Sequence, residues 1–547
     1  MKRSFTGRNM DRRRVCQGIA GLATAAIWAP VARSAEPVTA TVAQTRSGKI
    51  RGTRQGAIHS FKGVPYGADT SKTRFQRAAP PAPWAGECDA TQYGAQTPQF
   101  VRPYGDARGL LKSWAIPQGM SEDCLFLNLW TPGLRDGKKR PVMLYIHGGG
   151  FSAGSGTAAG YDGTRLAQRG DVVVLTMNHR LNIFGFLYLA EIGGAPYADS
   201  GNVGQHDIIM AMRWVRDNIE EFGGDPDNVL LFGESGGGMK ICTLMAMPEA
   251  EGLFHRAVVQ SGPLVWGADR NEATKAAHEA LGILGVAPNN LKALNDLTTE
   301  QILQAYFKLS LQSSLKLAPV VDGRGLPRHP FDPDAPRVSS KVPLMIGVTR
   351  TETSFIFSAP KYFSLTWNDV APNLKKYTGS MDPNAIVAKY RELMPKASPT
   401  DVFFEATTNL MMLRNVITIS DRKSAQNAAP VYRYELVWET PVDGGKWRAP
   451  HTLDIALAFD NVALSESMFG GAPEAQLLAD QMSEAWLAFA RSGNPNHKGL
   501  PAWTPYDAKN RQAMLFDVKS RMENARHQQQ IDALGTTPPW DATTAAM

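Results

Sequence analysis

Residues 228–238 read "NVLLFGESGGG", an apolar run followed by one serine among four glycines. The apolar run predicts a buried strand, and the glycines allow a sharp backbone turn where side chains would collide. Gly233 to Gly237 fit the pattern G-x-S-x-G, in which a serine stands on a strained corner between a strand and a helix. We therefore expect Ser235 to be an exposed nucleophile. The alternative is an ordinary glycine-rich turn.

Other buried-strand candidates share this lack of polar alternation, which is typical of a sheet that is covered on both faces. Helical stretches at 205–224 and 236–254 separate some of them, and a closing helix is expected at 478–493. Strands that alternate with helices predict an α/β fold with a mostly parallel central sheet. The candidate strands are "RPVMLYIHGGGF" (140–151), "DVVVLTMNHR" (171–180), "RAVVQSG" (256–262), "VPLMIGVTR" (342–350) and "PVYRYELVWE" (430–439).

The N-terminal segment, residues 1–35, is basic and is expected to be an export signal. It carries seven basic residues against Asp11, a net +6 that leaves only +1 of the formal +7 for the remainder. The basic stretch "DRRRV" precedes an apolar segment and then "ARSAEP", whose small residues suit cleavage near Ser34 or Ala35. The arginines favour a twin-arginine signal, and the general secretory route is the alternative.

Several classes of partner are disfavoured by these features. Because the basic charge lies in the signal, nothing indicates nucleic-acid binding. The apolar part of the signal is too short for a convincing membrane span, so we expect no stable membrane anchor. We find no linker that divides residues 36–547, which predicts a single catalytic domain, exported to the periplasm or secreted. No Cys/His spacing indicates a zinc site, and no cofactor is expected.

A second glycine run, "YIHGGGF" at 145–151, follows another candidate strand. Such a loop can expose backbone N–H groups that bind the oxyanion of a tetrahedral intermediate. Gly149 and Gly150, with the N–H of Gly236 after the serine, would form this oxyanion hole. An HGGG-type loop upstream of the serine corner is the arrangement expected of esterases with the α/β-hydrolase fold.

A serine nucleophile needs a base and an acid, which follow it in the chain order Ser, Asp/Glu, His in this fold. Of the three C-terminal histidines, we expect His497 in a polar turn and His527 on a solvated face. His451 in "WRAPHTLDIALAFDN" enters an apolar segment and is the preferred base. For the acid, Glu352 ends the strand "PLMIGVTRTE", while Asp322 and Asp401 remain alternatives on spacing alone.

Three cysteines remain outside the signal. Cys88 and Cys124 could pair in an oxidising compartment. Cys242 lies in an apolar helical stretch and is expected to be an inert core thiol.

The chain resembles the type-B carboxylesterase family, which includes cholinesterases and bacterial para-nitrobenzyl esterases. The resemblance covers residues of about 45 to 540 and implies the α/β-hydrolase fold with helical insertions over the active site. It rests on ordered blocks: "FKGVPYG" (61–67), "SEDCLFLNLWTP" (121–132), "YIHGGGFSAGS" (145–155), "NHRLNIFGFL" (178–187), "GNVGQHD" (201–207), residues 214–238, "VVQSG" (258–262), "PVVDG" (319–323) and "APHTLDI" (449–455).

The resemblance also implies roles for individual residues. Ser235 matches the nucleophile, Glu352 the acid and His451 the base, and Gly149, Gly150 and Gly236 match the oxyanion donors. Cys88 and Cys124 match the family's first disulfide. Ser261 resembles a supporting serine that hydrogen-bonds near the acid. The chain departs from the family at Gly236, where alanine is usual, and at Thr351 and Thr353, which replace an acidic residue and a glycine.

These features predict a serine hydrolase that acts on small carboxylic esters through a Ser-His-Glu triad and an acyl-enzyme intermediate. Amide or carbamate hydrolysis with the same triad, a non-catalytic cholinesterase-like binding protein and a lipase with an interfacial lid are the alternatives. Specificity is expected in loops on this scaffold, where aromatic residues could line a pocket or belong to the core. They are Phe100, Tyr104, Trp114, Phe307, Phe355 and Phe357.

Overall fold

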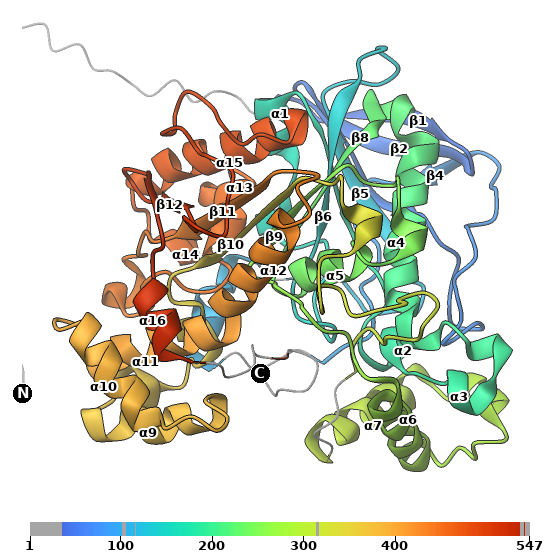
Figure 1. Cartoon of the computed structure of the whole chain (residues 1–547). Coiled ribbons are helices and arrows are strands. Elements are labelled where there is room, and N and C mark those ends of the chain that lie inside the picture. Colours follow the sequence, from blue (N-terminus) through green and yellow to red (C-terminus); the bar gives the residue numbers. More distant parts are fainter. Residues whose placement is uncertain are drawn as a thin grey trace, which may run out of the picture. The chain divides into compact units, whose positions relative to one another are not determined.

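A large mixed sheet runs through the fold, with helices on both of its faces (Figure 1). The computed structural model describes residues 36–541 apart from 101–104, 115, 117, 313–316 and 536–540. In this part of the chain the sheet has thirteen strands, in the order β1-β2-β3-β5-β7-β6-β8-β9-β10-β11-β12-β13, with β4 beside β2. They are β1 Thr39–Thr45, β2 Gly48–Gln55, β3 Ile58–Pro65, β4 Glu87–Asp89, β5 Phe126–Thr131, β6 Arg140–Ile146, β7 Val173–Met177, β8 Gly224–Glu234, β9 Arg256–Gln260, β10 Leu344–Thr349, β11 Val431–Leu436, β12 Ala513–Phe516 and β13 Arg521–Glu523.

The strands from β7 to β12 are parallel, and antiparallel strands extend both edges. The expected mostly parallel sheet is therefore confirmed. β6, β7, β9, β10 and β11 fall within the apolar runs that predicted them, and β8 begins four residues before its run. The sequence analysis did not identify β4, β5, β12 or β13 as strands. β4, β12 and β13 are only three or four residues long, too short to show a period.

Helices cover both faces of the sheet. The described helices are α1 Thr164–Gly170, α2 Asn182–Phe186, α3 Ala190–Gly193, α4 Val203–Asn218, α5 Gly236–Leu244, α6 Arg270–Leu284, α7 Thr299–Gln312, α8 Glu352–Ile356, α9 Trp367–Leu374, α10 Pro383–Leu393, α11 Pro399–Thr408, α12 Arg414–Ser424, α13 Leu453–Ala458, α14 Glu466–Phe469, α15 Glu474–Ser492 and α16 Gln528–Ala533. None of the described helices is long and apolar enough to span a membrane.

The central strands divide their side chains between two cores. On β6, Leu144 and Ile146 belong to the core that contains α4, α5 and α12, while Met143 and Tyr145 belong to the core under α1, α13 and α15. This alternation follows from the pleat, in which successive side chains point to opposite faces. Because both faces are buried, the strand has no polar alternation, which explains the continuous apolar run "VMLYI".

The register aligns the carboxyl ends of the parallel strands along one side of the sheet. Ile146 of β6 pairs with Gly233 of β8, and Glu234 pairs with Gln260 of β9. The segments that follow these strands therefore meet at their carboxyl ends, where ligands bind in open α/β sheets.

The described residues from Val38 onward form one compact unit. The predicted export signal at 1–35 lies outside the described residues.

Candidate active site

Ser235 occupies a strained corner between β8 and α5. Its φ of 55° and ψ of −124° are rare for a residue with a side chain, and its N–H donates to Gln260 O at 2.8 Å. The neighbouring glycines allow this turn, because a Cβ on Gly237 would lie 1.9 Å from Ile146 O and one on Gly233 would lie 2.6 Å from the same atom. The sharp turn expected from the G-x-S-x-G pattern is present.

The loop after β6 lies directly against this corner. A Cβ on Gly236 would come within 2.2 Å of Gly150 O and 2.5 Å of Gly150 N. Gly149 and Gly150 have φ of 92° and 62°, values that favour glycine. In the described backbone, the N–H groups of Gly149, Gly150 and Gly236 make no hydrogen bond with another residue. The three N–H groups that the sequence analysis named as oxyanion donors are therefore free of backbone partners in this part of the chain.

His451 and Glu352 are in contact, buried at the same end of the sheet. Glu352 Oε2 pairs with His451 Nδ1, and Glu352 Oε1 accepts a hydrogen bond from Thr349 N at 2.7 Å. His451 is 5% exposed, Ser235 is 7% exposed and Glu352 is fully buried, so the site is almost closed to water in this conformation. The sequence alternatives for the acid lie elsewhere: Asp401 pairs with Arg448, and Asp322 accepts from the N–H groups of 324 and 326.

The other ring nitrogen of His451 faces a carboxylate that sequence analysis did not assign. His451 Nε2 lies 3.2 Å from Glu234 Oε1, and no hydrogen bond joins His451 to Ser235 among the described contacts. Burial alone would lower the pKa of His451, but the carboxylates of Glu234 and Glu352 outweigh it and raise that pKa. Burial raises the pKa of Glu234 in turn.

A third buried carboxyl group lies in the same cluster. Asp454 Oδ2 accepts a hydrogen bond of 2.7 Å from Tyr434, and burial raises the Asp454 pKa to about 6. Both groups lie within motifs that the sequence analysis recognised: Glu234 directly precedes the serine, and Asp454 follows the histidine by three residues. These positions were the sequence features that could have identified them as part of the site.

Hydrogen bonds tie the turn that carries Glu352 to the segment that carries His451. Thr351 Oγ1 donates to Ala449 O and accepts from Ala449 N, each at 2.9 Å. Ser354 Oγ donates to Trp447 O at 2.7 Å. The Thr351 departure from the family pattern thus supplies a hydroxyl that holds the acid and base segments together.

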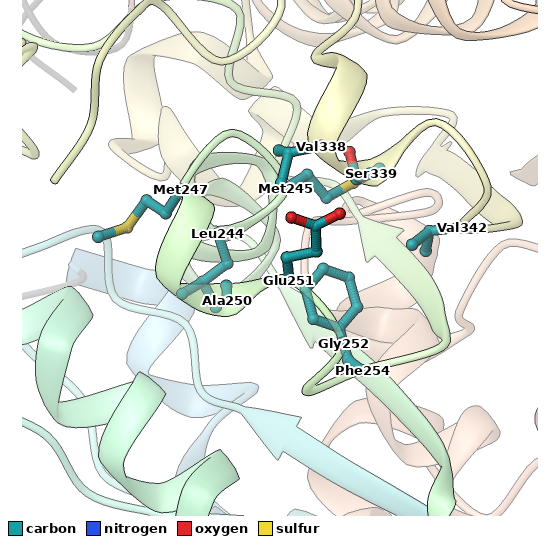
Figure 2. Close-up of a pocket in the computed structure, with 10 residues that line it drawn as sticks. All are labelled: Leu244, Met245, Met247, Ala250, Glu251, Gly252, Phe254, Val338, Ser339 and Val342. Carbon is teal, nitrogen blue, oxygen red and sulfur yellow. The ribbon is translucent and has the colours of Figure 1, made fainter. Parts of the chain in front are cut away.

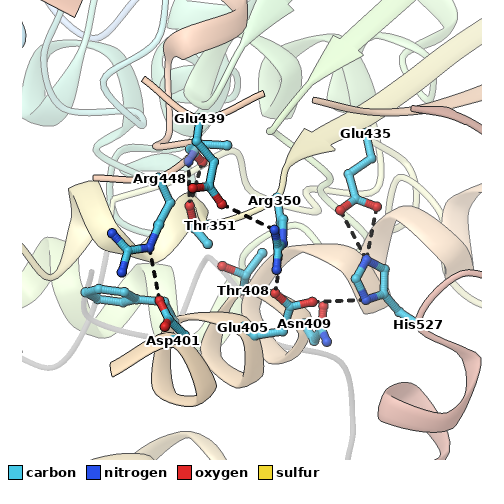
Figure 3. Close-up of polar contacts among 12 residues, drawn as sticks. Arg350, Thr351, Asp401, Glu405, Thr408, Asn409, Glu435, Glu439, Arg448 and His527 are labelled. Carbon is cyan, nitrogen blue, oxygen red and sulfur yellow. Dashed lines mark hydrogen bonds and ion pairs between the residues drawn. The ribbon is translucent and has the colours of Figure 1, made fainter. Parts of the chain in front are cut away.

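An ion-pair network begins at Arg350, next to the turn that carries Glu352 (Figure 3). Arg350 lies between Glu439 and Glu405, at 3.3 and 3.5 Å. Glu405 also contacts His527 Nδ1 at 3.1 Å, and Glu435 contacts His527 Nε2 at 3.0 Å. The expectation that His527 lies on a solvated face is wrong: it is 8% exposed, because α16 folds it against α11 and β11.

Ser261 does not make the expected hydrogen bond. Its side chain is fully buried, and its Oγ has no hydrogen-bond partner within the described part of the chain. Its contribution is through the backbone, where its N–H donates to Gly347 O at 2.8 Å with φ of 50°.

The expected disulfide between Cys88 and Cys124 is absent, and both are free thiols. The group that lies against Cys124 is the hydroxyl of Thr97, at 3.3 Å from Sγ.

Strand pairing keeps the two cysteines apart. Cys88 pairs with Ile50 in the β2–β4 ladder, and two residues later Ala90 O accepts from Lys62 N. Cys124 lies near the C-terminal end of β3, because the carbonyl of the next residue, 125, accepts a hydrogen bond from the N–H of residue 66. The stretch from 62 to 66 alone spans roughly 13 Å of extended chain. A disulfide requires Cα atoms within about 7 Å. The third cysteine, Cys242, is buried in α5 as expected.

The candidate specificity aromatics are dispersed. Phe355 lies beside the His451 ring, 6.1 Å between centroids, whereas Phe357 packs against Phe403 in the core. Trp114 is buried and donates to Ser465. Phe307 is 42% exposed and packs against the Phe100 ring at a tilt of 51°. The other candidate, at position 104, lies outside the described residues.

A separate small cavity lies at the far end of α5 (Figure 2). Its volume is about 20 Å³, enough for about one water molecule. Its lining runs from Leu244 to Phe254 and from Val338 to Val342, and includes none of the candidate site residues. Across the described residues, no cluster of His, Cys, Asp and Glu could hold a metal ion.

Comparison with known proteins agrees with this geometry. The model of the carboxylesterase family matches residues 39–534. The chain is 33% identical over 495 residues to the para-nitrobenzyl esterase of Bacillus subtilis, covering 89% of this chain and 97% of that protein. It is 31% identical to the phenmedipham hydrolase of Pseudarthrobacter oxydans, covering 86% and 94% of the two chains.

A solved carboxylesterase of Geobacillus stearothermophilus superposes with a TM-score of 0.79 at 36% identity, covering 90% of this chain and all of that one. Together with the family match, this likeness confirms the α/β-hydrolase fold. The chain belongs to the type-B carboxylesterase family and is a carboxylic ester hydrolase.

Proposed function

We propose that the chain hydrolyses small carboxylic esters through Ser235, His451 and Glu352 by way of an acyl-enzyme. The observation that carries this proposal is the buried contact between His451 Nδ1 and Glu352 at the edge of the sheet where Ser235 stands on its strained corner. A nucleophile, a base and a group that orients the base are the three parts that acyl transfer requires.

In the first step, Ser235 Oγ attacks the ester carbonyl and His451 Nε2 accepts the hydroxyl proton. Glu352 holds the proton on Nδ1, which leaves Nε2 free as the base, and stabilises the imidazolium that forms. In the present conformation Nε2 faces Glu234 Oε1, so the ring or the serine has to shift toward the attacking geometry. Such hydrogen bonds are often formed only when substrate is bound.

The negative charge that develops on the carbonyl oxygen is bound by the N–H groups of Gly149, Gly150 and Gly236. Because the site is nearly closed to water, these donors act in a low dielectric, where each is worth more than in solution. His451 then protonates the leaving alcohol. A water molecule, activated by His451 in the same way, hydrolyses the acyl-serine and releases the acid.

Hydrolysis of p-nitrophenyl acetate and butyrate by the full chain, beside Ser235→Ala, tests this proposal. We expect turnover by the wild-type protein and a loss of about 10⁴-fold or more in the variant. Parallel assays with matched anilide and carbamate substrates distinguish ester hydrolysis from the alternative chemistries. Residual activity of Ser235→Ala near that of the wild type would contradict the proposal.

We also propose that residues 1–35 direct export to the periplasm or the medium. Support comes from the basic, apolar and small-residue regions in that order. N-terminal sequencing of the protein from a periplasmic fraction should begin near residue 35 or 36. An unprocessed Met1 in the cytosolic fraction alone would contradict this.

A further inference from the structure

Lys240 places an amino group beneath the oxyanion loop. It lies on α5, five residues after Ser235, and its side chain is fully buried. Its Nζ donates to Gly150 O at 2.7 Å and to His147 O at 3.4 Å. Both acceptors are backbone carbonyls of the loop that carries the candidate oxyanion donors.

Three successive carbonyls of this loop are each fixed by a different donor. Gly149 O accepts from Ala153 N at 3.1 Å, and Phe151 O accepts from the N–H of residue 182 at 2.7 Å. Between them, Gly150 O is held by Lys240. With these carbonyls occupied, the N–H groups of Gly149 and Gly150 remain free. Of the three clamps, only the one on Gly150 comes from a titratable side chain.

The hydrogen bond from Lys240 to Gly150 O matters because the loop could otherwise adopt several backbone conformations. Residues 148–150 are all glycine, which populates positive and negative φ with similar ease. A peptide unit is planar, so fixing the Gly150 carbonyl fixes the orientation of the whole 150–151 peptide. That carbonyl lies close to Gly236, where an added Cβ would be 2.2 Å away. A small rotation would bring an acceptor toward the donor N–H of Gly236.

The groups around Lys240 do not neutralise its charge. The rings of His147 and His179 stack 4.8 Å apart, and burial, with a smaller contribution from Lys240, holds the pKa of both far below the usual value. The Phe151 ring lies 5.7 Å from Nζ. No carboxylate of the described residues pairs with Nζ, and burial lowers the pKa of Lys240 to about 7.

We propose that Lys240 is a positioning residue for ester hydrolysis: its ammonium group holds Gly150 O and keeps the oxyanion hole open. This inference rests on the proposed function of Ser235 and adds a proton-dependent part to it. A charged donor makes a hydrogen bond roughly twice as strong as a neutral one. The loop is therefore held more firmly below the Lys240 pKa than above it, while His147 and His179 stay neutral throughout.

Lys240→Met tests the inference, because methionine is similar in length, unbranched and apolar. We expect kcat to fall by about 10- to 100-fold, less than the ~10²–10³ lost with a direct oxyanion donor, and KM to stay within about twofold. The ratio of wild-type to variant kcat/KM should decrease as the pH rises through about 7. This ratio cancels the ionisation of His451, which both proteins share.

Lys423→Met is the matched control. Lys423 is also fully buried, donates to Ser339 O at 3.0 Å and Ser340 O at 2.6 Å, and has its pKa lowered by burial to about 8. Its hydrogen-bond partners in the described chain, Ser339, Ser340 and Gln426, lie outside the candidate active site. We expect its kcat to equal that of the wild type at every pH. An unchanged kcat in Lys240→Met, or a ratio that does not vary with pH, would overturn the inference.

Amide hydrogen exchange gives a second test that needs no turnover. Peptides covering 147–153 should exchange faster in Lys240→Met than in the wild type, and not in Lys423→Met. If Lys240→Met does not fold, the wild-type loop should lose protection between pH 6 and pH 8 after correction for intrinsic exchange, and constant protection would refute the inference. If the wild-type protein hydrolyses no ester but its loop shows the expected exchange behaviour, the proposed function fails while the hydrogen bond from Lys240 to the loop stands.

Discussion

His451 lies between two carboxylates, Glu352 on one ring nitrogen and Glu234 on the other. Both favour the imidazolium over the neutral ring, and so they stabilise the charge that forms when the serine loses its proton. The same pairing has a cost, since the ring must be neutral before it can accept that proton. We therefore expect the charge of Glu234 to raise the pH at which the base becomes available.

Glu234→Gln should move the acid limb of the pH profile to lower pH. The Glu234 carboxylate raises the pKa of His451, so removing its charge should lower that pKa. The measurement is kcat/KM for a p-nitrophenyl ester between pH 5 and pH 9. Glu439→Gln, which removes a carboxylate that pairs with Arg350 and not with His451, is the control and should leave the limb in place. A limb that stays fixed or moves upward in Glu234→Gln would refute this assignment.

Thr351→Val should weaken catalysis as well as stability. The hydroxyl bonds both the N–H and the carbonyl of Ala449, two residues before His451. Valine leaves the Ala449 N–H unpaired, while the carbonyl keeps its bond from the backbone N–H of residue 351. We expect a loss of about 1–3 kcal/mol in unfolding free energy and a fall in kcat of about tenfold, because the base is no longer aligned.

Thr353→Val is the comparison for that variant. Thr353 Oγ1 donates to Phe404 O on α11 rather than to the His451 segment. Chemical unfolding and steady-state kinetics should show similar stability losses in the two variants but a smaller kcat loss in Thr353→Val. Equal kcat losses would mean that the Thr351 bridge has no special role in alignment.

At the scale of elements, the site depends on the close approach of β6, β8 and α5. Gly237, the second residue of α5, packs its Cα against the last carbonyl of β6. This contact sets how near the helix N-terminus comes to the strand ends. It also explains why the second glycine of the G-x-S-x-G motif is needed at this corner.

Gly237→Ala should cost about 3 kcal/mol of stability, at the upper end of the range for overpacking. The new Cβ would lie 1.9 Å from Ile146 O, which is backbone and cannot swing aside. Gly282→Ala on α6 is the control, since nothing lies within 4 Å of its added Cβ. At that position the higher helix propensity of alanine should increase the unfolding free energy by up to about 1 kcal/mol. Urea unfolding of both variants measures the difference, and equal midpoints would contradict the packing argument.

For the whole molecule, the buried group formed by Glu405, Glu435 and His527 joins the C-terminal α16 to the sheet and to α11. The coulombic pull of Glu435 and the hydrogen bonds with both glutamates outweigh burial and raise the pKa of His527 to about 9. Because this folded-state pKa exceeds the unfolded value of about 6.5, the stabilisation is complete below pH 6.5. It is lost as the pH rises through about 9.

His527→Gln should therefore lower the melting temperature most at pH 6 and least near pH 9.5. Breaking a buried ion pair costs about 3–5 kcal/mol, and that difference should shrink as wild-type His527 loses its proton. The measurement is thermal unfolding across this pH range. His497→Gln, at a half-buried histidine bonded to a backbone carbonyl, is the control and should run parallel to the wild type. A His527→Gln curve that also runs parallel would contradict the assignment.

The parts of the fold that the sequence predicts are those with strong local signals. The apolar runs of β6, β8 and β10 and the glycines at 148–150 and 236–238 gave the parallel core and the serine corner. Glu352 needed the family resemblance, because a strand-end carboxylate has no spacing that ties it to His451, 99 residues later.

Other features depend on contacts between distant segments. In the sequence Lys240 is not distinguished from other helix residues, because its contact with the loop at 147–151 forms only in the folded structure. The burial of His527 follows from how the C-terminus returns to β11. The expected partner of Cys124 was wrong because the ladder between β2 and β4 fixes Cys88 elsewhere.

The central claim is that Ser235 carries the acyl group, and rapid quenching during turnover of a p-nitrophenyl ester tests it most directly. After acid quench and proteolysis, mass spectrometry should find the acyl mass on the peptide that contains Ser235, and Ser235→Ala should show neither adduct nor turnover. An acyl group on another residue, or undiminished turnover with no adduct on any peptide, would contradict the account.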